Sequence, residues 1–240
     1  MPAMASASAD VPIRDAATLI VFRGGRSSDA GPEILMGQRG ARAAFMPDKV
    51  VFPGGAVAPG DDAVALAGAP SESCLTRLTT DAGPTPQTLL AAAIRELWEE
   101  TGLILGRPGA WSDPPGDWAG FAAAGFRPDA TGLRFVFRAI TPPGRPRRFD
   151  ARFFLVSADR LSGDHGSGLL SGDGELSNLQ WIALDRVRGF NLPFITQVVL
   201  AELPVLLADD TPPRAVPFFD GQSEEILMQT LAGRSPLDVS

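Results

Sequence analysis

Residues 95–103 read RELWEETGL and are the most informative segment of the chain. Its three glutamates are spaced i, i+3 and i+4, so on an α-helix they fall within about 100° of one another. Leu90, Ile94 and Leu97 occupy the roughly opposite face, where they would pack on a sheet. The pattern therefore predicts an amphipathic helix with an acidic face.

Signals at both ends set the extent of this helix. Thr85 is a suitable N-cap, Pro86 suits the first helical position, and Gly102 suits the residue after the last turn. We therefore expect a helix over residues 87–101. Upstream, VFPGG (residues 51–55) ends a short strand in a tight glycine turn, where a backbone carbonyl is exposed as a possible ligand.

The three carboxylates of this helix, Glu96, Glu99 and Glu100, repel one another unless positive charge lies among them. Arg95 flanks the group and could neutralise one carboxylate. A hard divalent cation with oxygen ligands, Mg²⁺ above all with Mn²⁺ as a substitute, would neutralise the rest. A solvated acidic face is the commoner explanation of such a helix in general. The glycine turn that ends at Gly55 favours the metal site here.

The same nine residues resemble the second half of the Nudix box, G-x5-E-x7-R-E-U-x-E-E-x-G-U, in which U is a bulky aliphatic residue. The resemblance covers roughly residues 16–208. It implies an α+β fold, the Nudix α/β/α sandwich, in which a mixed β-sheet carries the catalytic helix after the glycine turn. It also implies Mg²⁺ held by the Gly55 carbonyl and the three glutamates, with a metal-bound water attacking a diphosphate in line.

The first half of the box departs from this pattern. Counting forward from Gly55 puts Asp61 where the glutamate belongs, but 33 residues then separate Asp61 from Arg95 instead of seven. Counting back from Arg95 puts Gln87 in that place. Either Asp61 replaces the glutamate that holds the box arginine, or that glutamate is missing. Both alternatives imply an insertion at about residues 60–86.

A long insertion preceded by R-x-x-F-M-P resembles the Nudix branch that includes peroxisomal coenzyme A diphosphatases. The matching segments are RAAFMP (residues 42–47) and RRFDARFF (residues 147–154). This resemblance implies coenzyme A or an acyl derivative as substrate. Dinucleoside polyphosphates, sugar nucleotides and NADH compete with it, and the sequence does not rank them, because the residues that read the non-phosphate half lie in variable loops.

Residues outside the acidic face are also candidates for the reaction. We expect Arg95 to belong to the catalytic set with the three glutamates, and Glu175 to be a candidate general base. An ordinary loop acid is an equal alternative for Glu175. Arg39, Arg148 and Arg152 are candidates for substrate binding, because guanidinium groups meet phosphate bidentately. A salt bridge is the alternative for each arginine.

Composition and charge limit the classes of function. The net charge of −7 argues against nucleic acid or an anionic membrane surface as the main partner. Cys74 is the only cysteine and His165 the only histidine, which excludes an intrachain disulfide and a Cys/His zinc cluster. The N-terminus lacks the pattern of a signal peptide, and no run approaches the length of a membrane span. We therefore expect a cytoplasmic protein.

We expect a flexible tail over residues 1–15 and one domain over residues 16–240. The length is sufficient for a single domain with a proper core. A second helix is expected over residues 194–207, interrupted or kinked at Pro204. Strands are expected over residues 18–23 and 33–39 as a hairpin, and over 49–52, 133–140, 151–156 and 179–184.

The leading hypothesis is an Mg²⁺-dependent hydrolase that cleaves the diphosphate of a nucleoside diphosphate linked to another moiety. A nucleotide-sensing Nudix module that binds without cleavage is the alternative. Such modules commonly lose box glutamates, and all three are intact here. A third hypothesis makes the acidic helix only a structural or protein-contact face. A homodimer is possible on the general ground that two-fold dimers are the commonest soluble oligomers.

Overall fold

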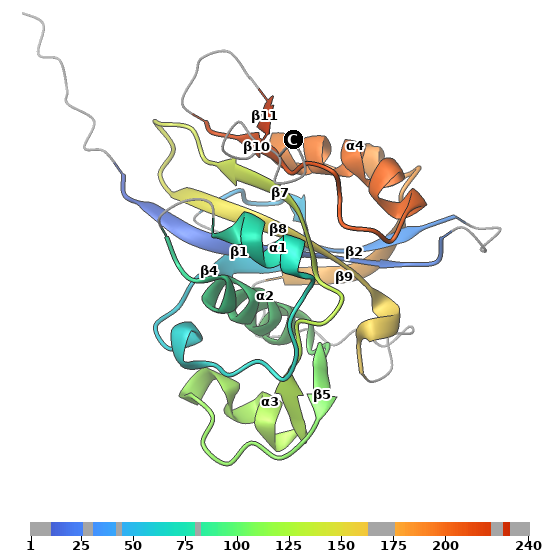
Figure 1. The fold of residues 1–240 in the computed structure, drawn as a ribbon. Coiled ribbons are helices and arrows are strands. Elements are labelled where there is room, and N and C mark those ends of the chain that lie inside the picture. The colour runs from blue at the N-terminus through green and yellow to red at the C-terminus, as the bar shows by residue number, and fades with distance from the viewer. Residues whose placement is uncertain are drawn as a thin grey trace, which may run out of the picture.

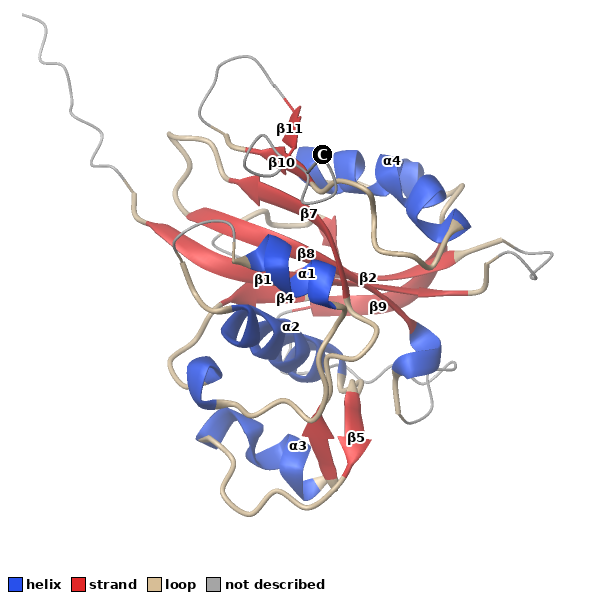
Figure 2. Ribbon diagram, viewed as in Figure 1, coloured by secondary structure: helices blue, strands red, loops and turns tan. Residues whose placement is uncertain are grey.

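The computed structural model describes residues 11–25, 31–41, 45–79, 83–162, 176–221 and 228–230. Within them, a mixed β-sheet lies between helix α2 (Pro86–Thr101) on one face and helix α4 (Phe194–Ala208) on the other (Figures 1 and 2). This is the α/β/α sandwich that the sequence predicts.

The sheet is built around β1 (Ile13–Arg23). One edge of β1 pairs in parallel with β8 (Arg148–Ser157), from the N-terminal end of both strands onward. The other edge pairs antiparallel with two partners, first with β4 (Gly54–Ala56) and then, near the end of β1, with β2 (Glu33–Arg39). The predicted hairpin over residues 18–39 is therefore confirmed, and β4 is a strand that the sequence did not predict.

The outer strands extend the sheet on both sides. Next to β8 come β7, β10 and β11 in that order, and β2 pairs with both β3 and β9. The β7–β10 pair is parallel like β1–β8, and the remaining pairs are antiparallel, so the sheet is mixed. The bounds are β3 (Val50–Val51), β7 (Arg134–Ile140), β9 (Leu176–Ala183), β10 (Pro217–Phe219) and β11 (Met228–Thr230).

Helix α2 begins and ends where the sequence predicts. The Thr85 hydroxyl accepts a hydrogen bond from the Thr88 N–H at 3.2 Å, and Pro86 follows it as the first helical residue. Gly102 adopts a left-handed φ of 71°, and its N–H donates to the Trp98 carbonyl at 2.8 Å. This termination fixes where the acidic end of α2 stops.

Each face of the sheet has its own apolar core. Leu19 of β1 and Leu90 of α2 belong to one core, whereas Ile20 of β1 and Leu200 of α4 belong to the other. Consecutive residues of β1 separate in this way because side chains alternate across a strand. All four side chains are at most 3% exposed, so both helices are held to the sheet by buried apolar surface.

Two long connections carry the small elements. The insertion between β4 and α2 contains two helical pieces, and the connection between α2 and β7 contains a small two-stranded sheet that the sequence did not predict. The bounds are η1 (Asp61–Ala63), α1 (Glu72–Leu78), β5 (Gly106–Pro108), η2 (Gly116–Trp118), α3 (Ala119–Ala123), β6 (Phe126–Pro128), η3 (Ala158–Arg160) and η4 (Val187–Gly189).

Two expectations need correction. The tail predicted over residues 1–15 is too long, because Ile13–Asp15 already belong to β1 and pair with the start of β8. Helix α4 continues through Pro204 to Ala208, so the interruption is wrong, while the alternative of a kink at Pro204 stays a prediction. Among the helices of the described residues, none combines the length and the apolar character that crossing a membrane requires.

Candidate active site

The glycine turn lies directly against the acidic end of α2. In β4, Gly54 pairs with Thr18 and Gly55 pairs with Ala17 of β1. A Cβ atom on Gly54 would lie 2.6 Å from the Ala17 carbonyl oxygen, and one on Gly55 would overlap the Glu96 carboxylate. Glycine is therefore required at Gly54, where the obstacle is the backbone of β1, whereas a side chain at Gly55 would displace the Glu96 carboxylate from the turn.

Glu100 ties the helix to this turn. The backbone N–H of Gly54 donates a hydrogen bond to Oε2 of Glu100 at 2.8 Å. Glu100 is buried, so this contact satisfies a carboxylate that water reaches poorly. The carboxylates of Glu96 and Glu100 thus both lie at the glycine turn, one against each of its two glycines.

Arg95 joins the acidic face to the insertion, and its five N–H groups all have acceptors. Nε and Nη2 donate to the two carboxylate oxygens of Asp61 at 2.9 and 3.1 Å. Nη1 donates to Glu96 at 2.9 Å and to Glu99 at 2.7 Å. The second N–H of Nη2 donates to the Ala56 carbonyl at 2.9 Å. A fully used guanidinium has one orientation, so Arg95 is a fixed point of the site.

The structure distinguishes the two residues that occupy the place of the box glutamate. Asp61 contacts Arg95 bidentately, and its Oδ2 also accepts from the Ala58 N–H at 2.8 Å. Gln87 lies two turns before Arg95, about 12 Å along the helix, and donates instead to the Val64 carbonyl at 2.7 Å. Asp61 therefore holds the arginine, and Gln87 fastens the segment that carries Asp61 to the start of α2.

One positive charge faces three negative ones in this cluster. Burial alone lowers the pKa of Arg95, but the hydrogen bond with Asp61 and the charges of Glu96 and Glu99 outweigh burial and raise the pKa above its ordinary value. The guanidinium is consequently protonated at neutral pH. Because a single cation cannot balance three carboxylates, the cluster has more negative than positive charges among the residues that the structure describes.

The donor chemistry of the cluster fits a hard divalent cation. Glu96, Glu99 and Glu100 offer only oxygen ligands beside the Gly55 backbone, as Mg²⁺ prefers. Among the described residues, no three acidic, histidine or cysteine side chains already surround a common point. The glutamates instead face Arg95 and the Gly54 N–H. The Glu96 and Glu99 side chains are 14% and 29% exposed, so they have room to turn towards a cation.

Arg152 has buried partners within the sheet. Its Nη1 donates to Asp15 of β1 at 2.5 Å and to the Asp150 carbonyl oxygen at 2.9 Å. Asp150 in turn accepts two hydrogen bonds from Arg138 of β7, at 2.7 and 2.8 Å. These contacts join β1, β7 and β8, and they favour the salt-bridge alternative for Arg152. Its role in substrate binding stays a prediction.

The other predicted residues lie at different distances from the glycine turn. Arg148 is buried, donates to the Thr141 carbonyl at 3.0 Å and pairs with Ile13, roughly 15 Å along β1 from the turn. Arg39 ends β2, and strand alternation places it on the face that carries Leu35 and α2. Glu175 lies outside the described residues, as do residues 42–44 of the RAAFMP segment.

The sequence did not single out the two backbone groups that complete the cluster. These are the Gly54 N–H, which binds Glu100, and the Ala56 carbonyl, which binds Arg95. Both belong to β4, a strand of three small residues whose side chains carry no alternating pattern. The only signal for it was the glycine turn itself.

No protein-family model matches the chain, and no curated protein matches it either. Among solved structures, it is similar to a Nudix hydrolase from Alicyclobacillus acidocaldarius, with 29% identity over 84% of this chain and 94% of that chain and a TM-score of 0.62. A MutT Nudix hydrolase from Burkholderia pseudomallei matches 80% of this chain and 98% of its own, with 17% identity and a TM-score of 0.46. The chain has the fold of the Nudix hydrolases, and the first similarity supports its place in the Nudix superfamily.

Proposed function

We propose that this protein is a Mg²⁺-dependent hydrolase that cleaves the diphosphate bond of a nucleoside diphosphate linked to another moiety. The observation that carries the proposal is the cluster around Arg95, in which three carboxylates share one guanidinium beside a glycine turn. The similarity to the Nudix hydrolase from Alicyclobacillus acidocaldarius supports the same class of reaction.

Glu96, Glu99 and Glu100, with the Gly55 carbonyl, are the groups that would hold the cation. When bound, Mg²⁺ would offset the charge of the diphosphate oxygens and lower the pKa of a coordinated water. The surplus of carboxylates over guanidinium groups among the described residues of the cluster favours such a cation over a neutral or anionic ligand. Mn²⁺ is a suitable substitute because it also prefers oxygen ligands.

The protein's own side chains orient the acidic groups and accept the proton. Asp61 fixes Arg95, and Arg95 fixes one oxygen each of Glu96 and Glu99. Glu99 is the most exposed of these carboxylates, which suits it to accept a proton from an attacking water. Glu175 is the second candidate for this general base.

Binding of the diphosphate needs positive charge that the acidic cluster does not supply. We propose Arg39 for this role, because it shares the α2 face of the sheet and its strand continues towards β3 and the glycine turn. Arg148 and Arg152 are weaker candidates, since both are buried in contacts of β8. Arg39→Ala should raise KM more than it lowers kcat if its guanidinium binds substrate equally before and during the reaction.

We propose coenzyme A or an acyl derivative as the substrate, because the RAAFMP and RRFDARFF segments resemble those of the coenzyme A diphosphatase branch. A panel of coenzyme A, ADP-ribose, a dinucleoside polyphosphate, a sugar nucleotide and NADH, at fixed Mg²⁺ with product masses measured, tests it. Hydrolysis of a P–O–P linkage in any of these substrates supports the diphosphatase. Preference for one of the other four would contradict coenzyme A while leaving the diphosphatase intact.

The matched variants for this panel are Glu99→Gln and Glu72→Gln. Glu72 is an exposed acid of α1, so its amide variant controls for the loss of one negative charge. We expect Glu99→Gln to lower kcat by about 100-fold or more while Glu72→Gln changes nothing. Measurable nucleotide binding without turnover by the unaltered protein would instead identify a sensing module.

A further inference from the structure

Helix α4 presents an apolar face to the outside of the molecule. Phe194 is 49% exposed and Val205 is 76% exposed, although the opposite side of the same helix packs into the core. Surface helices ordinarily carry polar residues on the outer face, and a helix that is apolar all round is ordinarily covered on every side. Gln197 is the one exposed polar residue on this side among the described residues, and the Phe194 ring contacts Phe219 of β10, with ring centroids 6.3 Å apart. The rest of the outer face of α4 is apolar and has no cover among the described residues.

The exposed residues form a regular stripe along this helix. Residues 194, 198, 201, 205 and 208 are spaced by four, three, four and three positions, which places them on one line of an α-helix. All five are apolar, and four of the five are exposed, with Val198 half-buried. This spacing is that of a seam along which one helix packs against another. The members are Phe194, Val198, Ala201, Val205 and Ala208.

The stripe complements itself when it meets a second copy in antiparallel orientation about Ala201. Phe194 then lies opposite Ala208 of the other copy, so that the largest side chain meets the smallest. Val198 lies opposite Val205, and Ala201 meets its own equivalent, where its small size allows the two helices to approach. Such an arrangement is the isologous contact of a two-fold dimer, in which each copy uses the same surface.

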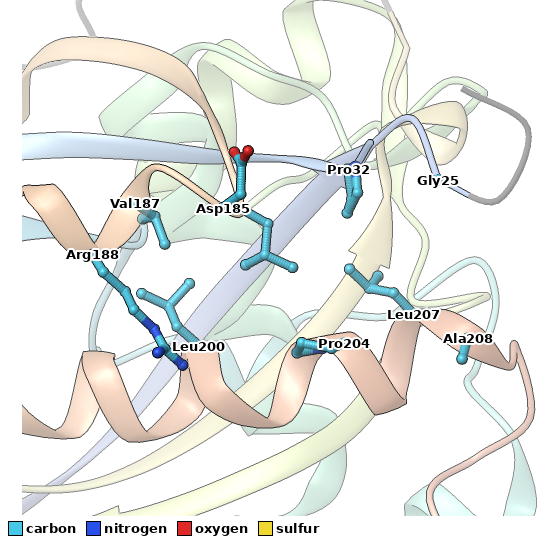
Figure 3. A pocket seen from close by; sticks show the side chains of 10 residues that line it. Gly25, Pro32, Asp185, Val187, Arg188, Leu200, Pro204, Leu207 and Ala208 are labelled. Atoms are coloured by element: carbon cyan, nitrogen blue, oxygen red, sulfur yellow. The ribbon is translucent and has the colours of Figure 1, made fainter. Parts of the chain in front are cut away.

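A shallow groove beside the stripe is lined by one acidic and one basic residue. It has a volume of about 640 Å³, and Leu200, Pro204 and Leu207 of α4 form one of its walls (Figure 3). Its two charged residues are Asp185 and Arg188, which have opposite signs and point to opposite sides of the groove in Figure 3. Within the described part of the chain, neither has an ion-pair or hydrogen-bond partner.

We infer that the outer face of α4 is the interface of a two-fold homodimer of this chain, with the two α4 helices antiparallel. A two-fold axis at Ala201 places the groove of one copy beside the stripe of the other copy. Asp185 and Arg188, which have no partner among the described residues, are then available to groups of opposite charge on the other copy. A 15-residue helix is only about 22 Å long, so the interface is modest in area and the dimer dissociates on dilution. The inference is independent of the proposed catalytic function.

Sedimentation velocity of the full-length protein from about 1 µM to about 100 µM tests the interface, because modest interfaces dissociate in this range. We expect a dimer at the upper end. Val205→Glu should shift the protein to monomer, because it places a charge in the apolar seam of each copy. Ala123→Glu, at an exposed position of α3, is the matched control and should leave the dimer unchanged.

A cysteine at position 201 tests the antiparallel arrangement directly. Ala201→Cys should form an intermolecular disulfide under mild oxidation, because the axis brings both copies of this residue together. Ala123→Cys should not, and the native Cys74 is buried and gives no background. A protein that is monomeric at every concentration, a dimer that Val205→Glu leaves intact, or a dimer that Ala201→Cys fails to link would each overturn the inference.

Discussion

Two groups of buried arginines form ion-pair networks with different charge balance. One is Arg95, and the other is the pair Arg138 and Arg152. Arg95 faces three carboxylates, whereas Arg138 and Arg152 share two, those of Asp15 and Asp150. Counted over the described residues, the second network has as many negative as positive charges, and it joins three strands. Counted in the same way, the first has more acids than bases, and it lies at a glycine turn. Buried ion pairs of the same kind can thus complete a sheet or prepare a cation site.

Under the proposed function, the charge balance of a network, rather than its burial, distinguishes a cation site from a structural ion pair. A balanced network gains nothing from an added ion, because each charge already has its counterpart. A network with surplus carboxylates is stabilised by a cation from solution. The same side-chain substitution in the two networks should therefore have different consequences for activity.

The largest effect is expected from Arg95→Met. The change leaves the buried Asp61 carboxylate without its partner and removes the cation between Glu96 and Glu99. Breaking a buried ion pair by removing one partner typically costs about 3–5 kcal/mol. Urea unfolding measures this loss, and turnover at a temperature where the variant is folded should also fall. Unchanged turnover would remove Arg95 from the site.

Arg152→Met should destabilise the protein without lowering its activity per folded molecule. It removes hydrogen bonds to Asp15 and Asp150, but Asp150 keeps its two bonds from Arg138. Hydrogen bonds to charged groups contribute about 1.5–3 kcal/mol each, so we expect a loss of that order in urea unfolding. A fall in kcat like that of Arg95→Met would contradict the structural role and revive Arg152 as a substrate ligand.

Gln87→Ala should have a smaller effect, of about 1 kcal/mol, because it removes one neutral hydrogen bond to the Val64 carbonyl. Since this bond fastens the segment carrying Asp61, activity should also fall several-fold. A double-mutant cycle with Asp61→Asn separates the two roles: the energies couple if Gln87 acts through Asp61. Strict additivity of the two changes would show that Gln87 only stabilises the insertion.

Asp129 and Arg107 extend the comparison to an ion pair at the surface. Burial raises the pKa of Asp129, but hydrogen bonds from Thr131 and Arg107 outweigh it and hold the pKa below its ordinary value. The resulting stability is present at neutral pH and is lost as the pH falls below the ordinary carboxyl range, through the depressed pKa. The Arg107 side chain is 58% exposed, so we expect less than about 1 kcal/mol.

Asp129→Asn is the variant that tests this. Its thermal unfolding midpoint should be slightly lower than that of the unaltered protein at pH 7, and the gap should close in the acid range. A gap that widens on acidification would show that the neutral form of Asp129 is the one that the fold favours.

Elements with local signals could be predicted from the sequence. Helix α2 has a capping threonine, a proline at its first position and a terminal glycine, and the structure gives the same ends within one residue. Helical spacing predicted that the three glutamates share one face of α2, and their assignment as metal ligands also needed the glycine turn and the resemblance to the Nudix box. Strands β4, β5 and β6 have three residues each and no alternating pattern, so only their pairing defines them.

The sequence named Asp61 as the candidate partner of Arg95, but it left open whether Arg95 has an acidic partner at all. The 33 residues between Asp61 and Arg95 have no sequence pattern that predicts how close Asp61 lies to helix α2. The position of Asp61 depends on contacts distant in sequence, such as the hydrogen bond from Gln87 to Val64. Sequence spacing predicts geometry within one helix or strand, and it loses that power across a long connection.

The parallel pairing of β1 with β8 has a consequence for how the chain folds. The strands are more than a hundred residues apart, yet they form the centre of the sheet. A chain emerging from the ribosome can close the β1–β2 hairpin early, but the second edge of β1 must wait for residues 148–157. Until then an apolar strand has unpaired backbone groups, so synthesis rate and chaperone supply should govern the yield of native protein more than the stability of the finished fold.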